Sequence, residues 1–271
     1  MMIPHPDYPF LLHFEQTAAR QDIIAFTTTR NGGASKPPFD TFNVGNYSED
    51  AAESICENRR RLSEALRIKP HCLIVPKQIH SDRIVPIDEI FLTLSNDEQT
   101  RQLDGCDSLI THVKGICIGV ATADCVPVLL YNNVQQVAAA IHAGWRGTVK
   151  KIAVKTVEAM QQQFGLSPSA LSALIGPSIG LSAFEVGEEV VEAFQNAKIS
   201  LENILKRNPV TGKAHINLSE ANRIQLLESG LTNDNIEIAG LCTYLHSETF
   251  FSARKEGIRS GRMLSGIIFQ Q

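Results

Sequence analysis

The sequence predicts an α+β fold that forms one domain. The chain has 271 residues, 43% of them hydrophobic, which is ordinary for a globular protein and enough for one large core. Strand patterns with short connections fill the centre of the chain, and amphipathic helix patterns lie on either side. The two types are mixed without a regular βαβ alternation, so we expect strand layers covered by helices. No repeat or linker interrupts the chain, which favours a single domain over residues 1–271.

The first third of the chain predicts strands on either side of one helix. Residues 22–30 predict a strand, and a loop rich in glycine and proline follows up to residue 45. Residues 51–67 predict a helix with an apolar side. The segment LIVPKQIH, residues 73–80, predicts another strand, which ends at His80.

The centre predicts antiparallel strands, because their connections are too short for parallel crossovers. Asn132 and Asn133 predict a hairpin turn between the last two central strands. Residues 148–165 are the clearest amphipathic helix, with Thr148 as N-cap and Gly165 as C-cap. The central strands are expected at 107–111, 115–122, 126–131 and 136–142. Further elements are expected as a strand at 171–176, helices near 187–196 and 217–230, and strands near 236–240 and 263–269.

Composition excludes several classes of protein. The net charge of −4 argues against a nucleic-acid partner, which would require a basic face. The N-terminal residues do not resemble a signal peptide, and no apolar run is long enough to span a bilayer. We therefore expect a cytoplasmic protein without a membrane partner, and a monomer rather than an oligomer. The six cysteines are scattered without a CxxC pair, so no disulfide framework is expected.

Three side chains that bind metals lie at the ends of strand patterns. His80 ends its strand, Cys125 interrupts two apolar runs in ATADCVPVLL, and His142 precedes the glycine-rich turn of AAIHAGWRG. Two histidines and one thiolate leave a fourth tetrahedral position open, which is typical of catalytic zinc. Zinc at such a site lowers the pKa of a bound water toward roughly 7. The spacing matches no local zinc motif, so the spacing by itself does not assign the site.

Each of these residues also has an ordinary structural interpretation. A lone histidine is more often a plain polar residue than a ligand, and Cys125 fits a buried thiol in a bend between two strands. Asp124 beside it needs partners for its carboxylate if it is buried. If one strand continues through both, Asp124 and Cys125 face opposite sides. The turn after His142 would form an anion site with Arg146, or it would be a plain strand–turn–helix connection.

A second motif suggests a different chemistry. Residues 176–180, GPSIG, fit the GxSxG pattern of a nucleophile elbow with Ser178 as nucleophile. The next helix pattern begins near Gly187 rather than at the serine, so a serine hydrolase is not favoured. The HxE…PCxxC signature of nucleobase deaminases and the glycine-rich nucleotide loops are absent.

Longer motifs carry a resemblance to a known family. They are TTTRNGGASKPPFDTFNVG, KQIHSDRIV, DGCDSLIT, ATADCVPVLL, AAIHAGWRGT, IGPSIGLSAFEVGEEV and FFSARKEGIRSGRMLSGI. The chain resembles, over nearly its whole length, the YfiH-like or multicopper polyphenol oxidase (laccase) domain family, also described as purine nucleoside phosphorylases and as peptidoglycan-editing factors. The resemblance implies an αββα domain related to bacterial toxin-type Cys–His hydrolases, with zinc on His80, Cys125 and His142. It also implies phosphorolysis of adenosine, inosine, guanosine and 5′-methylthioadenosine, and deamination of adenosine.

Under this interpretation, cationic groups should hold phosphate and a donor should stabilise the leaving purine. Arg146 and the turn at Gly147–Thr148 are expected to bind phosphate, and Asp124 to orient a histidine ligand or to move protons. In FFSARKEG, Ala253 and Lys255 stand where an aromatic residue and a second arginine are usual in the family. The candidates for substrate contacts are Arg30, Asn43, Arg146 and Arg254.

Three alternatives stay open at this point. A His₂Cys site also suits copper, but eight histidines without any HxH pair do not fit a multicopper oxidase. A metal-free enzyme would use Cys125 as nucleophile and His142 as base to edit a peptidoglycan precursor. A non-enzymatic module that binds nucleotides or a protein is the third alternative.

Overall fold

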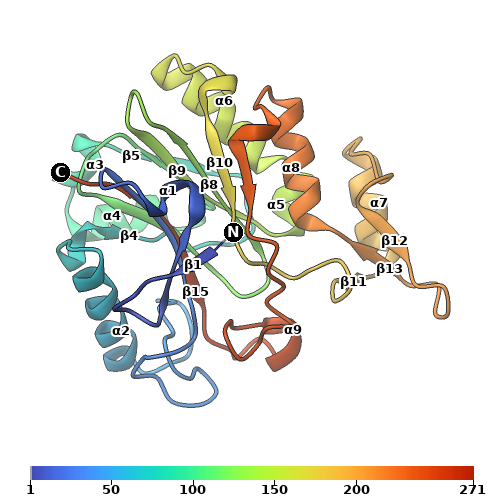
Figure 1. The fold of residues 1–271 in the computed structure, drawn as a ribbon, viewed down its shortest axis with the longest axis horizontal. Helices are drawn as coiled ribbons and strands as arrows, with labels where there is room; N and C mark the ends of the chain where they lie inside the picture. The colour runs from blue at the N-terminus through green and yellow to red at the C-terminus, as the bar shows by residue number, and fades with distance from the viewer. Residues whose placement is uncertain (1) are drawn as a thin grey trace.

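The computed structural model describes residues 2–271, whose two six-stranded sheets pack face to face (Figure 1). The first sheet has the order β1 (Met2–Pro4), β2 (Leu11–Phe14), β3 (Ile23–Thr28), β15 (Met263–Phe269), β7 (Cys117–Thr122) and β4 (Leu73–Ile74). The second has the order β14 (Ile236–Ile238), β10 (Ser172–Ile175), β8 (Val126–Asn132), β9 (Val137–Ala143), β6 (Ser108–Thr111) and β5 (Ile84–Ile87). Both sheets are mixed, and antiparallel pairs predominate.

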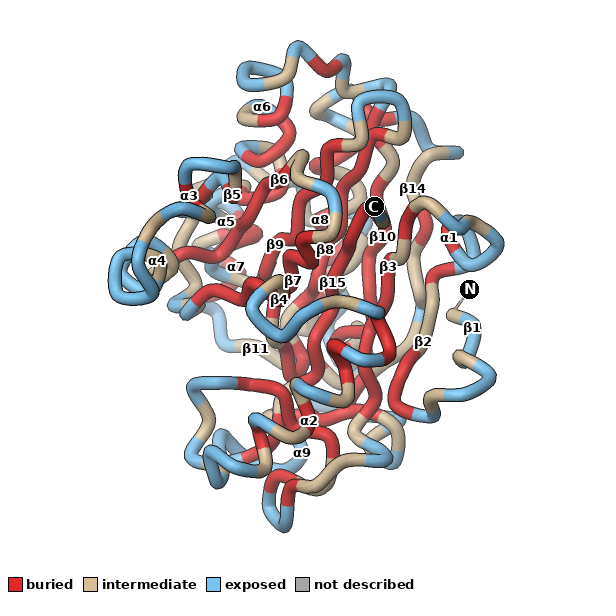
Figure 2. The backbone as a smooth tube through the Cα atoms, turned by 90° about the vertical axis from the view of Figure 1, so that its left-hand side faces the viewer, coloured by how far each residue is buried: buried red, intermediate tan, exposed pale blue. Residues whose placement is uncertain are grey.

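Buried apolar side chains fill the space between the sheets and cover both outer faces. Val120 and Ile267 of the first sheet and Leu129 of the second belong to the cluster between the sheets. Because side chains alternate along a strand, the neighbouring positions face outward and pack against helices. Helix α2 (Ala52–Ala65) covers the first sheet, and α6 (Ile152–Phe164) and α8 (Leu218–Glu228) cover the second. The predicted αββα layering is confirmed, and Figure 2 shows the buried strands at its centre.

Shorter elements surround this core. A small sheet, β11 (Glu185–Val186), β13 (Ala214–Ile216) and β12 (Leu205–Arg207), projects from the body together with α7 (Glu188–Asn196), as Figure 1 shows. The remaining α-helices are α1 (Glu15–Ala18), α3 (Glu89–Thr93), α4 (Asn96–Leu103), α5 (Trp145–Val149) and α9 (Ala253–Glu256). Among residues 2–271, no helix has the length and apolar character needed to cross a bilayer.

The predicted central hairpin is confirmed. Strands β8 and β9 pair antiparallel, and the side chain of Asn132 accepts backbone N–H bonds from Val134 and Gln135 in the turn. The expected strand at 73–80 is wrong beyond Ile74. Pro76 cannot donate to a sheet, and the chain continues as a loop in which His80 has a φ of 62°.

The predicted helix at 148–165 is two helices. Lys151, with a φ of 59°, separates α5 from α6, and Thr148 lies inside α5 rather than at an N-cap. The Thr148 hydroxyl donates to Gly144 O and accepts a hydrogen bond from Asn222. Gly165, with a φ of 67°, ends α6 as predicted.

The chain crosses from one sheet to the other at Asp124 and Cys125. Strand β7 ends at Thr122 in the first sheet, and β8 begins at Val126 in the second. Asp124 has a φ of 91°, so the segment is a bend rather than a continuous strand. The bend brings Cys125 to the edge where the two sheets meet the loop that carries His80.

Candidate metal centre

His80, Cys125 and His142 converge from three segments that are distant in the sequence. Their nitrogen and sulfur atoms all lie within 4.8 Å of one another, and no other such group of three occurs among residues 2–271. The Cys125 Sγ is 3.7 Å from His80 Nε2, and the two imidazole ring centroids are 4.8 Å apart. His142 is 4% exposed. The structure therefore brings together the three residues singled out as ligands from the sequence.

The spacing of these atoms fits a tetrahedral zinc ion. Zinc–sulfur and zinc–nitrogen bonds of ordinary length place a sulfur and a nitrogen ligand about 3.6 Å apart. The observed 3.7 Å between Cys125 and His80 requires little rearrangement. Gly144 keeps this space open, because a Cβ there would lie 2.9 Å from both Cys125 Sγ and His80 Cδ2.

Asp107, at the start of β6, holds two of the three ligands in place. Its carboxylate is 0% exposed and accepts a 2.7 Å hydrogen bond from His142 Nδ1, which leaves Nε2 of His142 for a metal. The same carboxylate accepts the backbone N–H groups of Ile79, His80 and Ser81 at 3.1, 3.0 and 2.7 Å. Partners of this kind fix the tautomer and orientation of metal-bound histidines.

Sequence reasoning did not single out Asp107. The available signal was an acidic residue directly before the buried strand SLIT, within the motif DGCDSLIT. A buried carboxylate in that place requires several donors. Nothing in the local pattern says that the donors are a loop 26 to 28 residues upstream and a histidine 35 residues downstream.

The electrostatics of the cluster favour a thiolate. Burial would raise the pKa of the Cys125 thiol, but the charge and hydrogen bonding of the neighbouring His142 and His80 outweigh it and lower this pKa to about 6. Burial would lower the pKa of His142, whereas the charge of Cys125 and the hydrogen bond to Asp107 raise it. The thiolate is the form that binds metals and attacks electrophiles.

The three ligands lie in a cavity of 730 Å³, a size within the usual range for small-molecule sites. Arg146, Arg254 and Arg262 line it, and none of these arginines forms an ion pair with a described residue. The guanidinium of Arg146 lies 4.2 Å from the centroid of the Trp145 ring. Sequence reasoning named Arg146 and Arg254 but missed Arg262.

The other expected substrate contacts lie outside the cavity lining. Arg30 donates to the carbonyls of Asp40 and Ser247 and forms an ion pair with Glu256. Asn43 is 0% exposed, and its Oδ1 accepts backbone N–H bonds from Gly45 and Arg262. Both residues thus order loops, and direct substrate contact by either stays a prediction.

The predicted phosphate-binding turn after His142 is closed by packing. Gly147 and Thr148 are buried, and α5 has only five residues, so it offers no extended helix N-terminus. A Cβ at Gly147 would lie 3.3 Å from His142 O and from a methyl group of Ile152. From this segment, only Arg146 lines the cavity.

Asp124 lines the cavity but does not orient a histidine. Its Oδ1 accepts a 2.6 Å hydrogen bond from Thr243 Oγ1, and its Oδ2 accepts a 2.7 Å bond from Arg254 N. The carboxylate therefore ties α9 and the loop before it to the bend at Cys125. The carboxylate that orients His142 is Asp107, not Asp124 as predicted from the sequence. Proton transfer by Asp124 stays a prediction.

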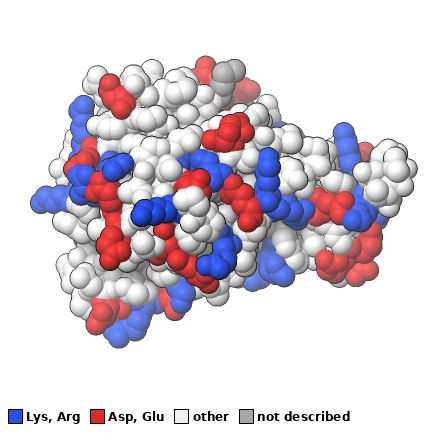
Figure 3. Space-filling view, turned by 90° about the horizontal axis from the view of Figure 1, so that it is seen from below, with Lys and Arg blue, Asp and Glu red and all other residues white. Residues whose placement is uncertain are grey.

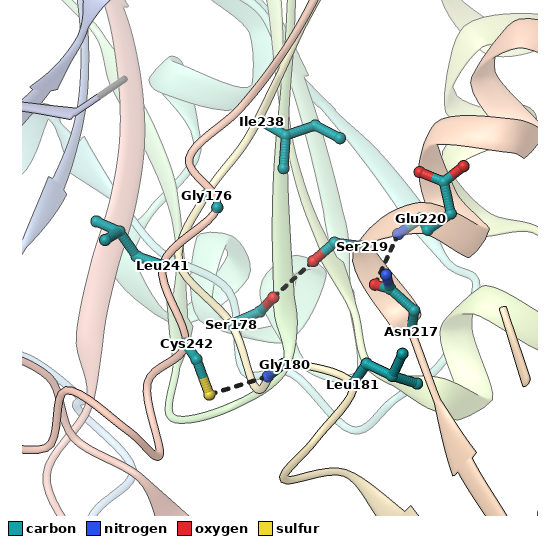
Figure 4. Close-up of a pocket in the computed structure, with 11 residues that line it drawn as sticks. Gly176, Ser178, Gly180, Leu181, Asn217, Ser219, Glu220, Ile238, Leu241 and Cys242 are labelled. Atoms are coloured by element: carbon teal, nitrogen blue, oxygen red, sulfur yellow. Dashed lines mark hydrogen bonds between the residues drawn. The ribbon is translucent and has the colours of Figure 1, made fainter. Parts of the chain in front are cut away.

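Ser178 of the GxSxG pattern lies in a separate cavity of 190 Å³ (Figure 4). Its Oγ is 2.8 Å from Ser219 Oγ, and the Sγ of Cys242 accepts a 3.1 Å hydrogen bond from Gly180 N. No histidine lines this cavity, and the next helix begins only at Glu188. Ser178 has neither a base nor the helix that a nucleophile elbow needs.

Comparison with known proteins assigns the chain to a protein family. The profile of the family described as multi-copper polyphenol oxidoreductase laccase matches residues 24–270. The chain belongs to this family. It is 44% identical over 261 residues to a purine nucleoside phosphorylase of Bacteroides thetaiotaomicron, covering 96% of this chain and 97% of that protein.

Two further relatives support membership of the laccase-like family. The adenosine deaminase RL5 of an unknown prokaryotic organism is 43% identical over 247 residues, which cover 91% of this chain and 94% of the relative. The crystal structure of the hypothetical protein YfiH of Bacillus licheniformis superposes with a TM-score of 0.87 at 29% identity and covers 98% of both chains. The resemblance to YfiH-like proteins predicted from the sequence is therefore confirmed.

Proposed function

We propose that the protein is a zinc-dependent purine nucleoside phosphorylase that also deaminates adenosine. The observation that carries the proposal is the His80–Cys125–His142 cluster, which fits zinc and opens onto a cavity of nucleoside size. Relatives at 44% and 43% identity are named for these two activities. Adenosine, inosine, guanosine and 5′-methylthioadenosine are the proposed nucleosides. We also propose that the enzyme is cytoplasmic and monomeric, without nucleic-acid or membrane partners.

Surface charge gives no reason to propose a nucleic-acid partner. Lys and Arg side chains are interspersed with Asp and Glu over the face drawn in Figure 3, and the net charge is −4. Duplex or single-strand binding would need a continuous basic stripe.

Zinc rather than copper is proposed for this donor set. One group of three donors among residues 2–271 cannot hold the several ions of a multicopper oxidase. No methionine among residues 2–271 lines the cavity, so its described wall does not offer the axial ligand that usually completes a blue-copper site. When bound, zinc supplies Lewis-acid chemistry at the open fourth position.

In phosphorolysis, a phosphate oxygen forms a bond to the ribose C1′ as the bond from C1′ to the purine nitrogen breaks. The electron pair of the broken bond stays on the purine, which takes up a proton from solvent, and ribose 1-phosphate is the other product. The chain must bind the phosphate dianion with cationic groups and exclude competing water. The three arginines on the cavity wall meet the first requirement.

In deamination, water adds at C6 of adenine and ammonia leaves, giving inosine. The group of this chain that can move a proton near the ligands is Asp124, because Cys125 and His142 would both be bound to the metal. Asp107 would keep His142 in one orientation throughout either reaction.

The test replaces Cys125 with serine and measures bound metal together with both activities. Protein purified without a chelator should contain about one zinc per chain, and Cys125→Ser should lose the zinc and at least about a hundredfold in base release from inosine, because a metal ligand is gone. The matched control is Cys242→Ser, which changes the cysteine of the neighbouring cavity and should keep both. Release of base at the wild-type rate by Cys125→Ser would show that the site is assigned wrongly.

One observation favours a second candidate, a metal-free Cys–His hydrolase. Cys125, His142 and Asp107 are arranged as nucleophile, base and orienting carboxylate, and the pKa of Cys125 is lowered to about 6. Such an enzyme would hydrolyse an acyl or amide bond, as in the editing of a peptidoglycan precursor. Full activity after complete removal of metal, with loss on alkylation of Cys125, would favour this candidate over the first.

A further inference from the structure

Arg262 stands out among the cavity residues because of how firmly its backbone is anchored. Its N–H donates to the Oδ1 of the fully buried Asn43 at 2.9 Å, and its carbonyl accepts a hydrogen bond from Val44 N at 3.2 Å. It directly precedes β15, a central strand of the first sheet. The base of this side chain is therefore part of the rigid core rather than of a mobile loop.

The guanidinium of Arg262 has only neutral partners. Its Nη1 donates to Ser260 O at 2.6 Å and to Gly261 O at 2.9 Å, and its Nη2 donates to Ile258 O at 3.3 Å. No carboxylate among residues 2–271 forms an ion pair with it. The side chain is part-buried, where a charge without an ion-pair partner costs more free energy than at the surface.

The position of this charge is beside the proposed metal ligands. Arg262 lines the same cavity as His80, Cys125 and His142. Asp124 is the one carboxylate among the described residues that line the cavity, and both its oxygens are engaged by Thr243 and Arg254. Neither oxygen of Asp124 bonds to Arg262, so no carboxylate among the described residues of the wall forms an ion pair with its guanidinium.

Gly45 leaves the space that the stem of Arg262 occupies. A Cβ on residue 45 would lie 2.8 Å from Arg262 Cγ and 2.9 Å from its Cβ. These are atoms near the backbone, so the side chain could not avoid such a Cβ by moving only its tip. The loop at Gly45 and the strand at Arg262 thus fix the direction of the guanidinium together.

We propose that Arg262 is the phosphate-binding residue of this cavity. This inference rests on the proposed phosphorylase function and names the residue that serves its anionic co-substrate. A guanidinium presents planar paired donors that match a phosphate, and such an anion would be the ion-pair partner that no described carboxylate provides. Held there, a phosphate oxygen would attack the ribose C1′ while the purine leaves with the bonding electron pair. Arg146 and Arg254, both exposed, would contribute to the general positive potential only.

The experiment uses the fact that phosphorolysis consumes phosphate and deamination does not. In the zinc-loaded enzyme, Arg262→Gln should raise the KM for inorganic phosphate by about tenfold or more, since a hydrogen-bonded charge is lost, and leave adenosine deamination within about twofold. Arg262→Lys keeps the charge without the paired donors and should give a smaller rise. Arg259→Gln is the matched control, because Arg259 is exposed, pairs with Glu49 and does not line the cavity.

Two further measurements complement this test. The first keeps the charge of Arg262, and the second needs no turnover. Gly45→Ala should raise the phosphate KM by displacing the Arg262 stem, although every charge remains. Calorimetric titration with inorganic phosphate should show weaker binding by Arg262→Gln than by the wild-type protein, by a factor similar to the change in KM. Circular dichroism and zinc content report whether each variant is folded.

The outcomes separate this inference from the proposed function. An unchanged phosphate KM and affinity in Arg262→Gln, or a rise confined to Arg146→Gln or Arg254→Gln, overturns the inference while phosphorolysis stands. An equal loss of both activities in a folded Arg262→Gln also overturns it, because the residue would then support the cavity as a whole. If the wild-type enzyme releases no base with phosphate, the proposed function fails, and calorimetry alone decides whether Arg262 binds the anion.

Discussion

The metal centre and the Ser178 cavity both lie where strands of the second sheet end, and both combine a cysteine with a glycine-rich turn. In the Ser178 cavity, the hydroxyl of Ser178 bonds to that of Ser219, and the sulfur of Cys242 accepts a backbone N–H. In the metal centre, Nδ1 of His142 bonds to Asp107, which leaves Nε2 of that ring without such a partner. The nitrogen and sulfur atoms that face inward have no ordinary partner except one another.

A reactive site differs from an ordinary buried polar cavity in whether its polar atoms bond to partners in the protein. Buried polar groups normally find partners, so a set of them left to face one another indicates a ligand or a reaction. Residue type alone does not separate the two cavities, because serine and cysteine occur in the packed one as well. The remaining predictions test this distinction from both sides.

The largest effect is expected from Asp107→Asn. The amide keeps the size of the carboxylate but replaces one accepting oxygen with a donating NH₂ group. That group would face either the N–H groups of the His80 loop or the Nδ1–H of His142, and the hydrogen bonds there would be lost. The zinc affinity should fall by about 10- to 100-fold, measured by competition with a chromophoric chelator.

Asp104→Asn is the control, since this exposed neighbour pairs with Lys77 and does not contact the ligands. An affinity unchanged in Asp107→Asn would mean that the histidines hold the metal without an orienting carboxylate.

A smaller effect is expected in the pH dependence of alkylation of Cys125 in metal-free protein. Because its pKa is lowered to about 6, Cys125 is mostly thiolate above that pH and mostly thiol below it. At pH 6 the thiolate is therefore far more populated than in an ordinary thiol, but a thiol of lower pKa is also a weaker nucleophile. The rate with iodoacetamide should exceed that of a model peptide by about tenfold, as measured by mass spectrometry of the Cys125 peptide.

Zinc should protect Cys125 in the same assay. A rate that keeps rising up to pH 8 or 9, as for an unperturbed thiol, would contradict the lowered pKa.

The smallest effect is expected from Ser178→Ala. Loss of the bond to Ser219 should lower the free energy of unfolding by about 1 kcal/mol, as measured by urea denaturation. Both enzymatic activities should stay within about twofold of wild type, because Ser178 is used for packing. A hundredfold loss of activity in a folded variant would restore the serine-nucleophile interpretation and remove the contrast between the two cavities.

Much of the fold was accessible from the sequence because it depends on local pattern. Alternating apolar residues predict the hairpin of β8 and β9, and an amphipathic pattern predicts the helix at 52–65. A glycine that can adopt the left-handed backbone conformation predicts the end of α6 at Gly165. The break at Lys151 was missed, since distant hydrogen bonds from Asn222 and Gln225 hold α5 at Thr148. The early end of the strand at Ile74 had a local signal that was overlooked, because Pro76 cannot donate to a sheet.

The candidate site divides in the same way. The ligand types of His80, Cys125 and His142 can be read from the chain, but their approach to within 4.8 Å depends on two sheets meeting. Asp107 was missed because its partners lie far along the chain. Arg262 was missed because its backbone bonds to the distant Asn43 and its guanidinium forms no ion pair with a described residue. The residues around Arg262 in the sequence cannot indicate that its guanidinium lacks an ion-pair partner in the fold.

The crossing of the chain at Asp124 and Cys125 has a mechanical consequence. His80 lies in the connection from β4 of the first sheet to β5 of the second, Cys125 in the connection from β7 of the first to β8 of the second, and His142 in β9 of the second. A metal ion held by all three residues would therefore tie both connections between the layers to one strand. Any slippage of one sheet against the other would change the coordination angles, so the integrity of the whole sandwich and the reactivity of the centre are coupled.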